Sequence, residues 1–191
     1  MRSICHVPGA TYVKIVPILN TFVEVFDALD EVELCRQSHS VRASSQATAA
    51  IVTYLAETYG QSAGLIPPLL SAERAAYFEW CFFVMTELDA HTLYVIRKHT
   101  ALAAIYSEAP NAVHAAREGF GKQVTVADRA LARQGPFILG NTFTGADILL
   151  ATSLDWAKRL EVSLTVTLGE YLERTTSRPP YRQAYVANQR R

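Results

Sequence analysis

The sequence has no excess of charge of either sign. Among its 191 residues, 18 are lysine or arginine and 18 are aspartate or glutamate, so the formal net charge is zero. Proteins that bind DNA or RNA normally present a basic face, and this total gives no support for one. We therefore expect no nucleic-acid partner.

Long apolar runs are also absent, although hydrophobic residues make up 50% of the chain. A helix that spans a bilayer needs about 20 consecutive apolar residues, and no run approaches that length. Lys14, Glu24 and Asp27 interrupt the start of the sequence, which argues against a secretory signal peptide. These patterns predict a cytoplasmic protein with no membrane partner.

Cysteine is scarce, and the three copies, Cys5, Cys35 and Cys81, lie far apart. They form no C-x-x-C pair, which argues against thioredoxin-type disulfide chemistry and favours reduced thiols. The five histidines form no H-x-x-x-H pair and no cluster with cysteine. We therefore predict no metal cofactor.

From Ser71 onward the sequence has helical periodicity. Ser71 can cap a first helix that continues to about Lys98, and Pro110 is a good first residue for a second. Further helices are predicted over residues 145–160 and 165–176. The apolar stripes predicted to face the core are Ala75, Phe78, Phe82, Met85, Leu88 and Val95 in the first helix, and Val113, Ala116, Phe120, Val124, Ala127 and Leu131 in the second.

The part before Ser71 is less regular. The stretch "ATAAIVTYLAETYG" predicts a short helix with Ala50, Ile51, Tyr54 and Leu55 on its buried side, and "QSAGLIPP" is typical of a linker. Short strands are possible near residues 4–7 and 31–34. We therefore divide the chain into two regions, residues 1–64 and 65–191.

The stretch "FTGADILL" predicts a capping box formed by Thr144 and Asp147. The Thr144 hydroxyl can accept a hydrogen bond from the Asp147 N–H, and the Asp147 carboxylate can accept one from the Thr144 N–H. Phe143 and Ile148 flank the box as a hydrophobic staple. Because apolar residues follow at once, we expect a buried helix start and interpret both capping residues as structural.

Several motifs, in order, resemble the cytosolic glutathione transferase family. The stretch "GPFILGNTFTGADILLATSLDWA" resembles the start of the central buried helix in that family's C-terminal domain. The stretches "AAIVTYLAETYG", "LIPP" and "ERAAYFEW" resemble the join between the family's two halves, and "YLERTTSRPPYRQAY" resembles its last helices. Together the motifs extend from about Ala47 to Tyr185.

The resemblance implies a mostly α protein, with an all-helical domain after a shortened thioredoxin-like α/β region. It also implies glutathione as cosubstrate, a small apolar electrophile as second substrate, a homodimer and a role in detoxification. Free glutathione is mostly protonated at neutral pH, because its thiol pKa is about 8.5, near that of free cysteine. In this family a Tyr, Ser or Cys near the first strand stabilises the thiolate, which attacks the electrophilic carbon.

The family anchors the γ-glutamyl group of glutathione at a helix start, with the motif [DE]-S-x-A-I. Here Ala50 and Ile51 match the last two positions, and Thr48 keeps a hydroxyl where the serine belongs. Ala47 replaces the acid, so the usual partner of the γ-glutamyl ammonium is missing, and Gln46 is a candidate substitute. The alternative is that Thr48 is an ordinary helix cap.

The first region is short for a thioredoxin-like domain, which needs about 74 residues. One alignment places the family's Val-Pro pair at Val16 and Pro17. The other, which we prefer, places residues 4–7 in the first strand, so that Thr11 or Tyr12 lies near the thiolate. A further hypothesis is that the residues before Ala47 come from a different reading frame.

The middle of the long first helix supplies candidate electrophile-site residues. In the family this part of the helix faces the cleft, and here Glu87, His91 and Tyr94 lie on neighbouring turns. The alternative, which we favour, is that Glu87 and His91 form an ordinary i,i+4 surface pair.

Three functions remain open at this stage. The first is a glutathione transferase-like enzyme that joins glutathione to a small apolar electrophile. The second is an inactive member that serves as a ligand-binding or scaffold protein, which the short first region and Ala47 favour. The third is a helical bundle without a ligand, which the ordered motifs disfavour.

Overall fold

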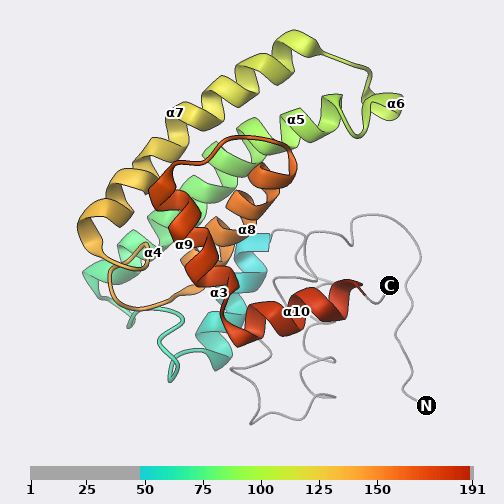
Figure 1. Cartoon of the computed structure of the whole chain (residues 1–191). Coiled ribbons are helices and arrows are strands. Elements are labelled where there is room, and N and C mark those ends of the chain that lie inside the picture. Colours follow the sequence, from blue (N-terminus) through green and yellow to red (C-terminus); the bar gives the residue numbers. More distant parts are fainter. Residues whose placement is uncertain (1–47, 190–191) are drawn as a thin grey trace, which may run out of the picture.

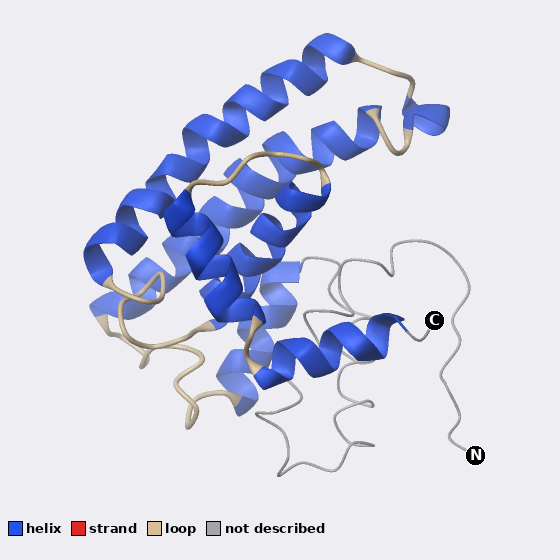
Figure 2. Cartoon of the chain, in the orientation of Figure 1, coloured by secondary structure: helices blue, strands red, loops and turns tan. Residues whose placement is uncertain are grey.

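The computed structural model of the chain describes residues 48–189, which are helical apart from their connecting loops (Figures 1 and 2). The mostly α fold is therefore confirmed for this part of the chain. The predictions for Thr11, Tyr12, Gln46, Ala47 and the early strands lie outside the described residues. The division at residue 64 stays a prediction.

The helical segments follow one another with short connections. In chain order they are α3 (Thr48–Tyr59), α4 (Ala72–Phe83), the π-helix η2 (Val84–Leu93), α5 (Tyr94–His99), α6 (Ala103–Tyr106), α7 (Pro110–Gln134), α8 (Gly145–Arg159), α9 (Val166–Thr176) and α10 (Pro179–Gln189). Ser71 caps α4, since its hydroxyl oxygen accepts a hydrogen bond from the Arg74 N–H.

The central helix of the bundle is α8, which packs against α3, α4, η2 and α9. Ten of its 15 residues are buried. The rod formed by α4, η2 and α5 lies alongside α7, and α10 extends away from the bundle beyond α9 (Figure 1). A helix that is apolar on most of its circumference is expected at the centre of a bundle, because it has neighbours on every side.

The buried face of α4 is shifted by one residue from the predicted stripe. Ala75 is exposed and the Phe82 side chain is 64% exposed, whereas Tyr77 and Cys81 are buried. The reason is that the chain from Ala75 to Met85 is apolar at almost every position. Two adjacent stripes therefore satisfy helical spacing, and periodicity alone cannot choose between them.

The predicted apolar face of α7 agrees with the structure, whereas that of α3 agrees only in part. On α7, every residue of the predicted stripe is buried except Val113, which still packs against the core. On α3, the buried side holds Val52 and Ala56 beside Ile51 and Leu55, while Ala50 and Tyr54 are exposed. The prediction for Ala50 and Tyr54 is wrong, because the face that meets α8 is rotated toward positions 52 and 56.

The long helix is continuous, as predicted, but its middle is a π-helix. At its end the Tyr94 N–H donates to the carbonyl of Asp89, five residues earlier. The Thr92 hydroxyl donates to the Leu88 carbonyl at 2.5 Å, which satisfies a buried polar side chain within the same helix. A π-helix has more residues per turn than an α-helix, so a spacing of three no longer places side chains on one face.

Candidate functional site

The first described helix, α3, is fixed onto the helical bundle by close backbone approach. A Cβ placed on Gly145 would lie 2.6 Å from the Tyr77 hydroxyl and 2.9 Å from Cγ1 of Val52, so only glycine fits there. The Gly145 N–H also donates to the carbonyl of Leu65 in the linker, at 2.8 Å. The start of α8 therefore holds both α3 and the linker.

A buried arginine makes a second connection between α3 and the bundle. The Arg74 guanidinium, on α4, donates to the Pro67 carbonyl at 2.9 Å and forms an ion pair with Glu57 of α3. It also lies over the ring of Phe78, 5.4 Å from its centroid. The Arg74 Nε has no hydrogen-bond partner among residues 48–189. No local pattern in the sequence predicts this contact, because an arginine on an apolar helix is expected at the surface.

The Asp147 carboxylate is a buried polar group in the first turn of α8, close to the contacts that hold α3. It is fully buried and accepts four hydrogen bonds, two on each oxygen. Oδ1 accepts from the Ile138 N–H and the Tyr171 hydroxyl, both at 2.9 Å. Oδ2 accepts from the Thr144 N–H at 2.8 Å and from the Thr144 hydroxyl at 3.0 Å.

Asp147 and Thr144 thus form the capping box that the sequence predicts. The sequence does not predict the two further donors to Asp147, which are the Ile138 N–H and the Tyr171 hydroxyl. Burial raises the pKa of the Asp147 carboxyl above its ordinary value, and the hydrogen bonds from Ile138, Thr144 and Tyr171 oppose that rise. All four partners are structural groups of the same chain. Nothing in this arrangement leaves the carboxylate accessible to a substrate.

The start of α3 is the place where the sequence predicts the glutathione anchor. The helix begins at Thr48, Ala49 is half-buried and Ala50 is exposed. The first N–H groups of a helix have no partner within it and favour an anion. Because Ile51 and Val52 lock the next turn against the bundle, this helix start has a fixed position on the helical domain.

The predicted electrophile-site residues lie on η2 or at the residue that follows it. Glu87 is half-buried and its Oε2 accepts a hydrogen bond from Nε2 of Gln123 on α7, at 3.3 Å. His91 and Tyr94 are exposed, and the Tyr94 side chain is 40% exposed. Within the described residues no ion pair joins Glu87 and His91. The role of these three residues stays a prediction.

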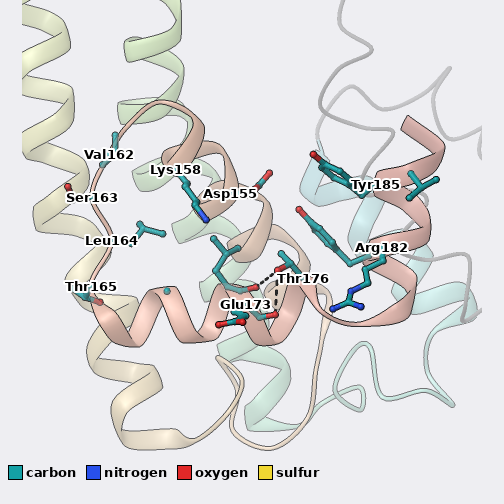
Figure 3. Close-up of a pocket in the computed structure, with 14 residues that line it drawn as sticks. Asp155, Lys158, Val162, Ser163, Leu164, Thr165, Glu173, Thr176, Arg182 and Tyr185 are labelled. Carbon is teal, nitrogen blue, oxygen red and sulfur yellow. Dashed lines mark hydrogen bonds between the residues drawn. The ribbon is translucent and has the colours of Figure 1, made fainter. Parts of the chain in front are cut away.

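A separate groove of about 930 Å³ is formed by the end of α8, the loop that follows it, α9 and α10 (Figure 3). None of the predicted site residues lines it. Residues 48–189 contain no cluster of three metal-ligating side chains, and none of their helices is long and apolar enough to span a membrane.

A family model described as the glutathione S-transferase C-terminal domain matches residues 110–186. This range contains α7, α8, α9 and most of α10, including the capping box. No curated protein sequence matches the chain significantly.

Solved structures of glutathione transferases resemble the chain over a longer range. A glutathione transferase from Methylococcus capsulatus str. Bath is 27% identical, with a TM-score of 0.64, and the match covers 75% of this chain and 67% of that one. A glutathione transferase homologue from Lodderomyces elongisporus, with two GSH per subunit, is 20% identical, with a TM-score of 0.67 and coverage of 74% and 66%.

A third similar structure is a glutathione transferase from Phanerochaete chrysosporium with oxidized glutathione. It is 14% identical, has a TM-score of 0.71, and the match covers 92% of this chain and 90% of that one. At identities of 20% and 14% the likeness concerns the fold alone. This chain spans about two thirds of the length of the first two structures.

Proposed function

We propose that this chain is a member of the glutathione S-transferase family that binds glutathione and transfers its thiolate to a small apolar electrophile. In that reaction the sulfur forms a bond to an electrophilic carbon, and the thiol proton is lost to solvent or to a nearby base. The electron pair displaced from the carbon leaves with a leaving group or moves to an acceptor atom in conjugation. No metal is needed for this chemistry.

The observation that supports the proposal best is the packing of the α3 start. By sequence resemblance Thr48 matches the serine of the family's γ-glutamyl motif, and the next turn of α3 is held by Val52 against Gly145. In this proposal the N–H groups that follow Thr48, together with its hydroxyl, bind the γ-glutamyl carboxylate. Gln46 and Ala47 would lie beside the ammonium, and Gln46 would supply the only polar side chain of the two.

The remaining roles are assigned by the family resemblance. Thr11 or Tyr12 would donate a hydrogen bond to the thiolate, which favours its ionised form and lowers the thiol pKa. Glu87, His91 and Tyr94 would line the electrophile site. We also expect the protein to assemble as a homodimer in the cytoplasm.

Glutathione binding to the purified full chain tests the proposal directly. Calorimetry should show binding in the micromolar to low-millimolar range, weakened in Thr48→Ala and unchanged in Thr142→Ala, whose threonine lies exposed in the loop before α8. Turnover with a generic electrophile then distinguishes an enzyme from a glutathione-binding protein.

The second candidate function is a catalytically inactive binding or scaffold protein. It is favoured by Ala47, which removes the acid that normally pairs with the γ-glutamyl ammonium. A chain that keeps its helical circular dichroism but binds no glutathione at tens of millimolar would support this second function and refute the first.

A further inference from the structure

The short helix α6 is apolar at every position, yet none of its residues is buried. It belongs to a run of six apolar residues, "ALAAIY", which we call the apolar tip (residues 101–106). Each residue of the tip is exposed or half-buried, with Ile105 72% exposed and Tyr106 43% exposed. Single exposed apolar residues are ordinary on protein surfaces, whereas a continuous exposed run points to a partner that covers it.

The apolar tip projects from the far end of the rod formed by α4, η2 and α5 (Figure 1). Its main neighbour among the described helices is α5. A peptide or a small molecule needs a groove, which a projecting tip does not offer. The shape of the tip therefore favours a broad, flat partner that accepts it from one side.

The conformation of the tip is fixed by hydrogen bonds, although it leaves apolar surface in water. Ser107 ends α6 with a φ of 66°, a left-handed value that is unfavourable for a residue with a side chain. The Ser107 N–H donates to the Ala103 carbonyl at 2.8 Å, and the Ser107 carbonyl accepts from Nδ1 of His99, also at 2.8 Å. These bonds stabilise a strained turn that presents Ile105 and Tyr106 outward.

Two cations lie at the base of the apolar tip. Arg97 and Lys98 are in the last turn of α5, and Nζ of Lys98 lies 4.9 Å from the centroid of the Tyr106 ring. Glu108 is the only carboxylate between Arg97 and Pro110, so this segment has one positive charge in excess. An apolar surface beside a tyrosine and basic side chains has the chemistry of a contact with an anionic membrane surface.

We propose that the apolar tip binds the surface of an anionic lipid bilayer. Ile105 and the ring of Tyr106 enter the boundary between the headgroups and the acyl chains, while Arg97 and Lys98 lie against the anionic headgroups. Tyrosine suits this boundary, because its ring is apolar and its hydroxyl is polar.

Such a contact is peripheral and needs no spanning helix. It therefore replaces the expectation of no membrane partner, which was based on the absence of a long apolar run. One short tip with two cations gives weak and reversible attachment. The contact involves no residue of the proposed glutathione site, so its test is independent of the proposed transferase activity.

The test is sedimentation of the full chain with lipid vesicles, without glutathione. One set of vesicles contains equal parts of phosphatidylcholine and phosphatidylglycerol, and the other contains phosphatidylcholine alone. The chain should bind the anionic vesicles more tightly than the neutral ones, and this preference should shrink as salt is raised. Lys98→Gln should weaken binding to the anionic vesicles about five-fold, whereas Arg129→Gln, on an exposed part of α7, should change nothing.

The apolar part of the contact is tested by a matched pair of variants. Ile105→Ser should weaken vesicle binding about ten-fold, while Val166→Ser, at a residue that is 78% exposed at the start of α9, should leave it unchanged. Ala104→Leu adds apolar surface to an exposed position of the tip and should tighten binding, an effect that loss of structure would not produce.

Three results would overturn the proposal. The first is that the full chain does not sediment with the anionic vesicles. The second is that Ile105→Ser and Val166→Ser bind vesicles alike. The third is self-association, measured by size-exclusion chromatography with light scattering, that Ile105→Ser abolishes, because a second copy of the chain would then cover the apolar tip.

Discussion

The Tyr171 hydroxyl of α9 donates a hydrogen bond of 2.9 Å to the Asp147 carboxylate in the first turn of α8. The same carboxylate oxygen accepts the Ile138 N–H from the loop that precedes α8. One buried side chain therefore connects two helices and a loop, in addition to capping its own helix. Its importance to the fold is larger than a helix cap alone would suggest.

Asp147→Asn should lower the free energy of unfolding by about 2 kcal/mol or more, because an amide offers one acceptor oxygen and places an NH2 group near the Thr144 N–H. Denaturant titration with circular dichroism measures the change. Asp128→Asn is the control, since Asp128 is partly exposed and accepts a single side-chain bond from Thr165. Equal stability of the two variants would contradict the central role of Asp147.

Gly145→Ala should destabilise the protein by about 1–3 kcal/mol, because the added methyl group would overlap the Tyr77 hydroxyl and Val52. Gly121→Ala provides the opposite case: it has open space around it and should stabilise α7 by up to about 1 kcal/mol. Thermal unfolding of both variants checks the pair. If both substitutions stabilise the protein, the close packing of α3 on α8 is not present in solution.

The protein should lose stability as the pH rises above about 9. Burial raises the pKa of the Cys81 thiol to about 12 and raises those of the Tyr77 and Tyr171 hydroxyls well above their ordinary values. A raised pKa in the folded state means that the unfolded chain loses these protons first. The stabilising effect is complete below the unfolded-state values and is lost as the pH rises through the folded-state values.

Each such group adds a slope of about 1.4 kcal/mol per pH unit in that window. Urea titrations at several pH values between 7 and 11 measure the total slope. Tyr77→Phe removes one of the titrating hydroxyls and should flatten the curve above pH 10. A stability that stays constant up to pH 11 would show that these groups are not buried as described.

Arg74→Lys should destabilise the protein by about 1–2 kcal/mol. A lysine has the charge but not the planar guanidinium, so it loses the geometry in which one group bonds to both the Pro67 carbonyl and Glu57. The substitution also removes the Arg74 Nε, which has no hydrogen-bond partner among residues 48–189, and this limits the size of the effect. Arg129→Lys on exposed α7 is the control, and chemical denaturation is the measurement.

Local signals in the sequence predict the elements of this fold well. Ser71, Pro110 and Thr144 each mark a helix start that the structure contains at or next to that residue. The stripe on α7 was identified because polar residues separate its apolar ones. The mostly helical fold also follows from short motifs, since those motifs contain the residues that cap and terminate helices.

Contacts between distant segments were not predictable in the same way. Tyr171 meets Asp147 and Arg74 meets Glu57 only after the helices have packed, and neither pairing leaves a local pattern. The buried face of α4 could not be chosen from the sequence, because its apolar run allows two adjacent stripes with helical spacing. The π-helical geometry of η2 and the hydrogen bond from Gln123 of α7 to Glu87 likewise depend on packing.

The dependence of α3 on the start of α8 has a consequence for biosynthesis. Val52 leaves the ribosome long before Gly145, the residue against which it packs. Until then α3 is a helix of only 12 residues, too short to be stable in water, and α8, its main neighbour among residues 48–189, has not yet been made. The rod of α4, η2 and α5 can pair with α7 earlier, because these neighbours follow closely in the chain. Attachment of α3 is therefore a late step of folding, and the nascent chain exposes Ile51, Val52 and Leu55 to chaperones and proteases until α8 has emerged.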